Sequence, residues 1–186
     1  AKLGRLLFHD KILSANRNIA CATCHSHQFG SSDGLSLGIG EGGIGIGPNR
    51  TAGVGDDKIK KRIPRNSLAL WNLGFKEITT LLHDGRVTKS NIFDNNFNTP
   101  AQEALPKGLE NIVAVQALFP MTRQFEMAGN PGENEIIGLV SKVGKDSMRI
   151  DAVWPVITNR IRAIPEYVEL FKSTFDDIDT ALDINI

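Results

Sequence analysis

The segment Cys21-Ala22-Thr23-Cys24-His25 contains both cysteines of the 186-residue chain and sets the expectation for its fold. The pattern C-x-x-C-H is the attachment sequence of c-type haem. Two thiols on one helical turn can each form a thioether with a haem vinyl group, and the histidine that follows can ligate the iron from the proximal side. We therefore expect one covalent haem c, held by Cys21 and Cys24, with His25 as its proximal iron ligand.

Other uses of paired cysteines fit this sequence less well. A disulfide or a thioredoxin-like redox pair does not need the histidine, and such a pair belongs in a βαβ context that the sequence lacks. A zinc site needs two further ligands with paired spacing, which His9, His27 and His83 do not supply. Attachment of haem c implies an oxidising compartment outside the cytoplasm, so we expect an exported, periplasmic bacterial protein.

Composition and charge narrow the class of protein. The chain has 21 basic and 21 acidic side chains, whereas a nucleic-acid binder would show a basic excess or stripe, so no nucleic-acid partner is expected. No apolar run approaches the roughly 18–20 residues of a membrane helix, so no membrane span is expected. The sequence starts at Ala1 inside what looks like folded sequence, which fits either a removed leader or a fragment that begins within its gene.

Hydrophobic periodicity predicts a mainly α chain. A helix is expected over residues 3–8, ending at Asp10, and a short helix carries the two cysteines. Residues 64–86 are interpreted as loop with a short helix. Strand signals are scarce, and the remaining helices are expected over residues 109–119, 131–143, 151–162 and 165–174.

A glycine-rich stretch, residues 30–55, follows the cysteine segment. It contains a G-x-G-x-x-G spacing, but no strand precedes it and no helical pattern follows, so a dinucleotide-binding fold is not expected. The composition instead predicts a flexible loop that folds over one face of a cofactor.

Taken in order along the chain, several segments resemble the bacterial di-haem cytochrome c peroxidases, a superfamily that also includes the MauG enzymes, which oxidise tryptophans of a partner protein. The resemblance runs from residue 1 to about residue 179, with an insertion of about twenty residues after Arg86. It implies a cytochrome c-like haem domain with long loops and a helical insertion. Beside the haem motif, the matching segments are Leu3-Gly4-x-x-Leu7-Phe8-x-Asp10-x-x-Leu13-Ser14, Arg65-Asn66-Ser67-Leu68-Ala69-Leu70-Trp71-Asn72, Asp84-Gly85-Arg86, Phe125-Glu126-Met127 and Ile164-Pro165-Glu166-Tyr167.

The resemblance covers only the N-terminal, peroxidatic haem domain of the family. Residues 1–186 are therefore expected to form a single c-type haem domain, without the second C-x-x-C-H domain whose haem feeds electrons to the first. We therefore expect the chain to be a fragment or one of two polypeptides. The implied function is reduction of hydrogen peroxide with electrons from a second haem c domain or polypeptide, which a small c-type cytochrome or a cupredoxin would supply, and a homodimer is also implied.

Two alternatives are open. One is a MauG-like di-haem oxidase that acts on a protein substrate. The other is a mono-haem c-type electron carrier, which needs a strong sixth iron ligand, usually methionine or histidine. Met121, Met127 and Met148 are available for that role, and Met127 stands out because it is next to Glu126. The length of the chain is generous for a carrier.

The resemblance also implies catalytic residues. Glu126 matches the family's catalytic glutamate, which would move a proton between the two peroxide oxygens. Gln116, ten residues upstream, matches the distal glutamine that would hydrogen-bond bound peroxide or water, and Pro120 keeps the family spacing between them. Without the resemblance, the same two residues would be typical of a surface carboxylate and a solvated helix position.

Two positions depart from the family pattern. Glu41 stands in the glycine-rich loop where many members have a histidine that caps the iron at rest, so we expect no histidine cap. A glutamate at this position is typical of a solvated loop side chain, and a distal or relay role is the alternative. His83 stands where the family usually has a tryptophan relay between the haems, and imidazole is harder to oxidise than indole. Trp71 and Trp154 could substitute, although a lone tryptophan is more typical of core packing.

The remaining candidates concern calcium and the haem propionates. Asn66 matches the family asparagine that donates an oxygen to a calcium ion between the two haem domains, with a turn-capping asparagine as the alternative. Arg65 and Arg86 could pair with propionates because guanidinium groups suit carboxylates, or could form ordinary surface salt bridges.

Overall fold

The computed structural model describes residues 1–140 and 150–176, and helices dominate the described residues. Their bounds are α1 (Lys2–His9), α2 (Cys21–Cys24), α3 (Ile112–Ala117), α4 (Glu135–Val140), α5 (Ile150–Arg162) and α6 (Pro165–Lys172). The mainly α prediction therefore agrees with the structure. No helix in the described ranges is long and apolar enough to cross a membrane.

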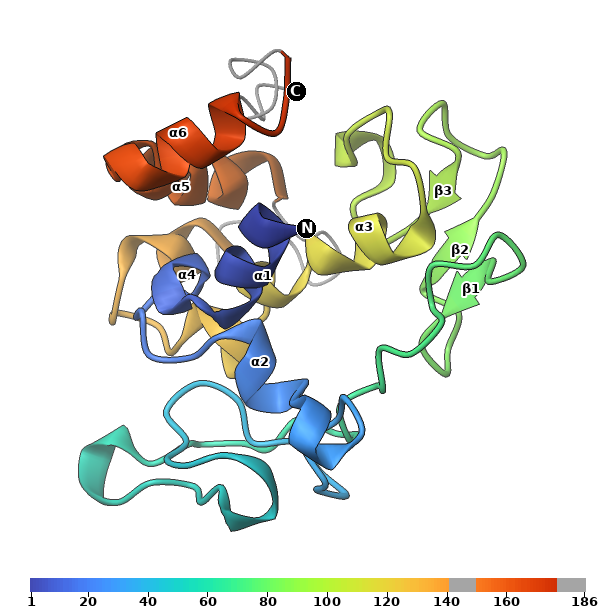
Figure 1. Ribbon diagram of the computed structural model, residues 1–186. Helices are drawn as coiled ribbons and strands as arrows, with labels where there is room; N and C mark the ends of the chain where they lie inside the picture. The colour runs from blue at the N-terminus through green and yellow to red at the C-terminus, as the bar shows by residue number, and fades with distance from the viewer. Residues whose placement is uncertain (141–149, 177–186) are drawn as a thin grey trace.

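Helices α1, α5 and α6 pack around one hydrophobic cluster on one side of the molecule (Figure 1). Their apolar residues recur at helical spacing, and Pro165 is at the first position of α6, where a missing N–H costs nothing. The predicted spans differ from the observed ones by no more than two residues at either end. The most deeply buried side chains of this first cluster include Ala128, Ile136, Val153 and Ile157, each 0% exposed.

Asparagine caps shorten two predicted helices. The Asn111 carboxamide oxygen accepts the N–H groups of Val113 and Ala114, so α3 begins at Ile112 rather than at residue 109. The Asn134 oxygen accepts the N–H of Ile137, so α4 begins at Glu135 rather than at residue 131. The predicted end of α4 at residue 143 lies outside the described residues.

A three-stranded antiparallel sheet, β1 (Thr80–Leu81), β2 (Val87–Lys89) and β3 (Phe97–Asn98), occupies the other side of the molecule (Figure 1). Leu81 pairs with Val87, and Lys89 pairs with Phe97. The prediction of a helical insertion after Arg86 is wrong, because β2, β3 and a single 3-10 turn, η5 (Gln102–Ala104), fill this region. The short helix predicted within residues 64–86 is also wrong, because turns and β1 stand there.

The sheet and α3 enclose a second hydrophobic cluster, which α5 joins to the first. Ile150, at the start of α5, is buried in the second cluster, whereas Val153 and Ile157 on the same helix are buried in the first. The ring of Trp154 packs against both clusters, and its Nε1–H donates to the Leu118 carbonyl at 3.0 Å. Trp154 is therefore a packing residue in this fold.

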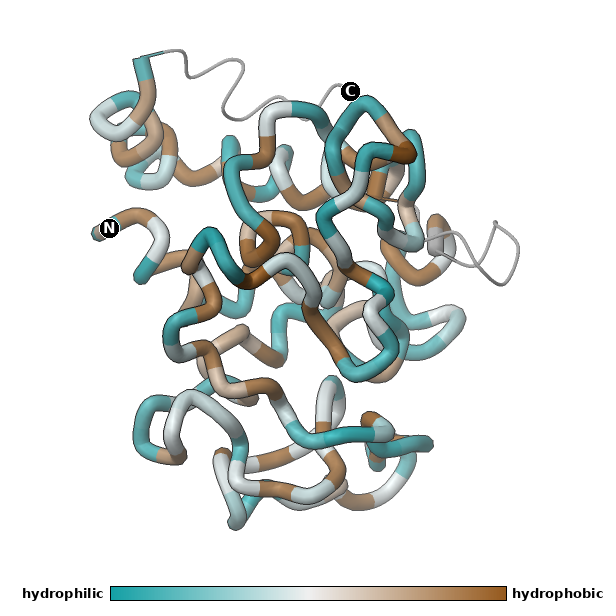
Figure 2. The backbone as a smooth tube through the Cα atoms, turned by 90° about the vertical axis from the view of Figure 1, so that its right-hand side faces the viewer, coloured by the Kyte–Doolittle hydropathy of each residue, from teal (hydrophilic) through white to brown (hydrophobic). Residues whose placement is uncertain are grey.

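Residues 30–78 form a region of turns and short 3-10 segments with no α-helix and no strand longer than a single bridge. The glycine-rich part of it projects from the helical body at the lower end of the molecule in both views (Figure 1, Figure 2). This is the loop that the composition predicts, and it begins directly after the cysteine segment.

Candidate functional site

Helix α2 presents the two thiols on a single turn. The Thr23 hydroxyl oxygen accepts the N–H of Ala20 at 3.1 Å and fixes the start of this turn. Burial raises the pKa of both thiols, that of Cys24 to about 11, so both are neutral S–H groups before haem attachment. Both cysteines are free, and their spacing by one turn is the arrangement expected for thioethers to the two haem vinyl groups.

The ring of His25 is oriented by a backbone carbonyl. Its Nδ1 lies 2.9 Å from the carbonyl oxygen of Leu68, and since a carbonyl can only accept, Nδ1 carries the proton. Burial lowers the pKa of His25, which favours the neutral ring. The neutral ring keeps a lone pair on Nε2, and a second partner that fixes the ring and its tautomer is the usual arrangement for an iron-binding histidine.

Arg50 organises the glycine-rich loop from inside. Its guanidinium group is buried and donates to three carbonyl oxygens, those of Ile39 (2.7 Å), Gly40 (2.6 Å) and Gly45 (2.6 Å). Ile39 in turn lies next to the haem motif, since its carbonyl oxygen is 3.8 Å from the Cys24 sulfur. The loop is thus fixed beside the cysteines rather than free in solvent.

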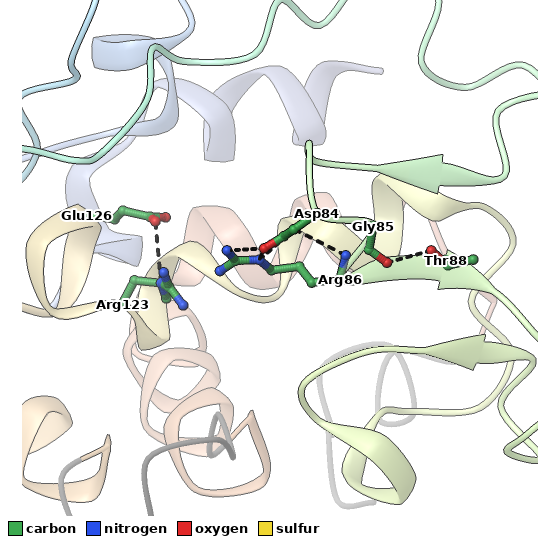
Figure 3. Close-up of polar contacts among 6 residues, drawn as sticks. All are labelled: Asp84, Gly85, Arg86, Thr88, Arg123 and Glu126. Atoms are coloured by element: carbon green, nitrogen blue, oxygen red, sulfur yellow. Dashed lines mark hydrogen bonds and ion pairs between the residues drawn. The ribbon is translucent and has the colours of Figure 1, made fainter.

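Glu126 lies on a single π-helical turn, η7 (Gln124–Ala128), that contacts this loop. Its Oε1 is 3.5 Å from Nε of Arg123, an i,i+3 pair (Figure 3). Burial raises the pKa of Glu126, although the charges of Arg123 and Arg86 oppose the rise. The carbonyl oxygen of Glu126 accepts the N–H of Glu41 at 3.0 Å, and Ile39, two residues before Glu41, lies beside Cys24, so this turn and the cysteine segment contact the same part of the loop.

Gln116 lies on α3 with an unsatisfied oxygen. Its Oε1 is buried and has no hydrogen-bond partner among the residues that the structure describes. A buried polar atom without a partner costs about 1–3 kcal/mol, so such atoms are unusual outside sites that receive a ligand or water.

Arg86 is engaged by Asp84 in the segment after β1. Its Nε lies 3.0 Å and 2.8 Å from the two carboxylate oxygens, and Nη2 donates to Oδ2 as well (Figure 3). Hydrogen bonds from Arg86 hold the pKa of Asp84 well below its usual range. His83 next to them is exposed. Arg86 would therefore have to share its guanidinium group between Asp84 and a propionate.

Glu41 is buried rather than solvated, which corrects the expectation for a loop glutamate. It is 8% exposed, and its Oε1 accepts the side-chain N–H groups of Asn16 (2.8 Å) and Asn18. Its carboxylate is thus committed to two amides at the base of the loop.

The other predicted residues lie apart from these contacts. Arg65 and Asn66 are exposed, and the Asn66 amide donates only weakly to the Ser67 carbonyl at 3.4 Å. Within residues 1–140 and 150–176, no three His, Cys, Asp or Glu side chains form a group that could hold a metal ion. Met121 and Met127 are buried in the first cluster, and Met148 lies outside the described residues.

The proximal segment leaves apolar surface uncovered next to His25. Leu68, whose carbonyl oxygen accepts from His25, is 39% exposed, and Trp71 is 61% exposed with its Nε1–H donating to the Gly30 carbonyl at 2.9 Å. The exposed apolar side chain of Leu68 beside His25, the two thiols on one turn and the unsatisfied Gln116 oxygen are all compatible with a covalent haem.

A protein-family model described as di-haem cytochrome c peroxidase matches residues 1–185. This chain belongs to that family. Among curated proteins, the methylamine utilization protein MauG of Methylorubrum extorquens is 44% identical over 52 residues, and the cytochrome c peroxidase Ccp of Escherichia coli is 48% identical over 46 residues. These matches cover 28% and 25% of this chain but only 14% and 10% of the two relatives.

Membership of the di-haem cytochrome c peroxidase family confirms the resemblance that the sequence segments imply, and it supports haem c as cofactor. Sequence reasoning missed three residues that the geometry brings to the site: Arg50, Arg123 and Asn18. The spacing of Arg123 and Glu126 on one helical turn is a signal that could have been used. Arg50 and Asn18 carry no such signal, because their partners are carbonyls and a carboxylate 5 to 23 residues away.

Proposed function

We propose that residues 1–186 form the haem c domain of a di-haem peroxidase at which hydrogen peroxide is reduced to water. The observation that supports this most is Glu126, a carboxyl group paired with Arg123 on a turn that contacts the loop segment beside Cys24, and burial raises its pKa. One hydrogen peroxide, two electrons and two protons give two water molecules, and we assign the electrons to a second haem c outside this sequence.

Each chain residue has a distinct task in this proposal. Haem c, when bound, supplies the iron that receives peroxide and carries the electron transfer. Glu126 takes the proton from one peroxide oxygen and returns it to the other, which becomes the leaving water. Arg123 holds the carboxylate in place by its ion pair, and the unsatisfied Oε1 of Gln116 accepts a hydrogen bond from peroxide or water.

The test is the reaction of the haem-loaded protein with hydrogen peroxide, followed by stopped-flow absorbance. We expect Glu126→Gln to lower the second-order rate constant by about 10²–10⁴-fold, the usual contribution of a general acid–base group. Glu110→Gln, a change of the same type at an exposed position, is the matched control and should react at the wild-type rate. Wild-type reactivity in Glu126→Gln would overturn the proposal.

The MauG-like oxidase is the second candidate, and one observation favours it. The loop over residues 38–47 contains no histidine, and one curated relative is a MauG protein. We infer that the haem rests without a histidine cap, so the oxidised protein should lack the spectrum of bis-histidine low-spin iron. An oxidase would store the two oxidising equivalents until a protein substrate is added, whereas a peroxidase would pass them to an electron donor at once.

Several finer assignments belong to the same proposal. We place the protein in the periplasm, with a small c-type cytochrome or a cupredoxin as electron donor and a homodimer as its assembly. Calcium at Asn66 is also proposed, with further ligands from a second haem domain, because one exposed amide oxygen does not make a site. The carrier alternative is disfavoured by the family match, and a methionine–iron band in the oxidised spectrum would restore it.

A further inference from the structure

The π-helical turn that carries Glu126 is held by donors from three other segments of the chain, two of them far away in the sequence. The carbonyl oxygen of Glu126 accepts the N–H of Glu41 at 3.0 Å, and that of Met127 accepts the N–H of Ala15 at 2.9 Å. The next carbonyl, that of Ala128, accepts the side-chain N–H of Asn134 at 3.0 Å. Three consecutive carbonyls at a helix end are normally left without partners inside the helix, so these donors fix its position.

The three donors are linked to one another by side chains. Asn16, the neighbour of Ala15, donates to Oε1 of Glu41 at 2.8 Å, and its own oxygen accepts from Asn134 at 2.7 Å. Asn18 donates to the same Glu41 oxygen. Glu41 therefore connects its own backbone donor to the segment that precedes the haem motif.

The glycine-rich loop is in direct contact with this turn. A Cβ on Gly40 would lie 1.9 Å from the carbonyl oxygen of Phe125, so only glycine lets the loop backbone approach this closely. The carboxylate of Glu41 and the guanidinium of Arg50 hold the loop from opposite ends of the Ile39–Gly40–Glu41 segment. A shift of Glu41 is therefore transmitted to the backbone of Glu126.

We propose that Glu41 is a positioning residue, whose side-chain bonds to Asn16 and Asn18 hold its backbone N–H against the Glu126 carbonyl and so fix the Glu126 carboxyl group at the site. The catalytic part of this proposal rests on the proposed function. The hydrogen bonds from Asn16 and Asn18 to Glu41 and from Glu41 to the Glu126 carbonyl, here called the clamp, can be tested separately. Glutamine can replace Glu41, since its amide oxygen accepts the same two bonds, whereas alanine cannot.

The kinetic test is a double-mutant cycle on the haem-loaded protein. Glu41→Ala should lower the rate constant for peroxide by about 10–10²-fold, the scale on which a small misplacement of a catalytic group acts, while Glu41→Gln stays within about threefold of wild type. In a Glu126→Gln background, Glu41→Ala should have no further effect, since the group that it positions is gone. An equal loss in both backgrounds would overturn the proposal, because it would show that Glu41 acts by some other route.

Glu133→Ala is the matched control. Glu133 accepts from the same Asn16 amide at 2.8 Å but makes no bond to the loop, so its loss should leave the peroxide rate constant unchanged. Hydrogen–deuterium exchange of the peptide over residues 124–129 tests the clamp without reference to activity. Exchange should rise in Glu41→Ala and not in Glu133→Ala.

The two measurements separate the possible failures. If Glu126→Gln reacts at the wild-type rate while exchange rises in Glu41→Ala, the proposed function fails and the clamp stands. If exchange over residues 124–129 is unchanged in Glu41→Ala, the clamp itself is refuted, whatever the kinetics show.

Discussion

The helical body and the loop region over residues 30–78 are stabilised in different ways. The body buries a large set of aliphatic side chains between α1, α4, α5 and α6, whereas Ile39 is the one buried large hydrophobic side chain in residues 30–78. Polar groups that donate to backbone carbonyls hold the loop region instead, and Arg50, His25 and Trp71 supply them. Apolar packing therefore stabilises the body, and hydrogen bonds to backbone carbonyls stabilise the loop region.

The largest expected effect is a loss of stability in the helical body. Ile157 is 0% exposed in the first cluster, so Ile157→Ala creates a cavity and should lower the free energy of unfolding by about 2–5 kcal/mol. Urea denaturation followed by circular dichroism measures this loss. The bonds from Arg50 to the loop carbonyls do not involve this cluster, so proteolytic cleavage over residues 39–50 should stay at the wild-type level; increased cleavage there would show that the two regions are not independent.

A smaller effect is expected in the loop region. Arg50→Met keeps the aliphatic stem but leaves three carbonyls without their donor, which should cost about 1–3 kcal/mol and increase proteolytic cleavage over residues 39–50. Arg62→Met is the control, because Arg62 is exposed and makes one bond to the Leu37 carbonyl at 3.1 Å. Equal losses for the two variants would contradict the view that Arg50 holds the loop.

The difference between these regions also explains what the sequence could predict. Helices α1, α5 and α6 follow from apolar periodicity and a proline start, which are local signals. The sheet was missed because strands of two or three residues carry no readable alternation. The loop contacts join residues such as Asn18 and Glu41, whose separation along the chain has no periodic signature.

The candidate site divides in the same way. The haem motif is contiguous, so its residue types and spacing predict its chemistry directly. The burial of Glu41 and its bonds to Asn16 and Asn18 depend on how the loop returns to the segment before α2, and composition alone suggested a solvated side chain. The catalytic assignment of Glu126 and Gln116 stays a prediction that the experiments above test.

The smallest expected effect concerns the stability of the site at different pH values. Burial raises the pKa of Glu126 above its ordinary 4.5, so the folded protein keeps this proton to higher pH than the unfolded chain does. The contribution to stability is therefore complete below about pH 4.5 and is lost as the pH rises through the folded-state pKa. Glu126→Gln should become more stable relative to wild type as the pH rises from 4 to 7, measured by urea denaturation.

Glu133 gives the control with the opposite sign. Burial acts to raise its pKa, but hydrogen bonds from Asn130 and Asn16 outweigh this, and the pKa is lowered. Its contribution is present above pH 4.5 and is lost as the pH falls through the folded-state pKa, so Glu133→Gln should lose stability relative to wild type as the pH rises. If the stability of both variants relative to wild type changed in the same direction with pH, the burial of the Glu126 carboxyl group would not be the cause of the trend in Glu126→Gln.

Trp154 bears on the cooperativity of the whole molecule. Its ring packs against both hydrophobic clusters, and α5 contributes buried residues to each. Neither cluster can therefore unfold separately without removing this indole from its packing against the other cluster. We therefore expect the sheet and the helical body to unfold together in one cooperative transition.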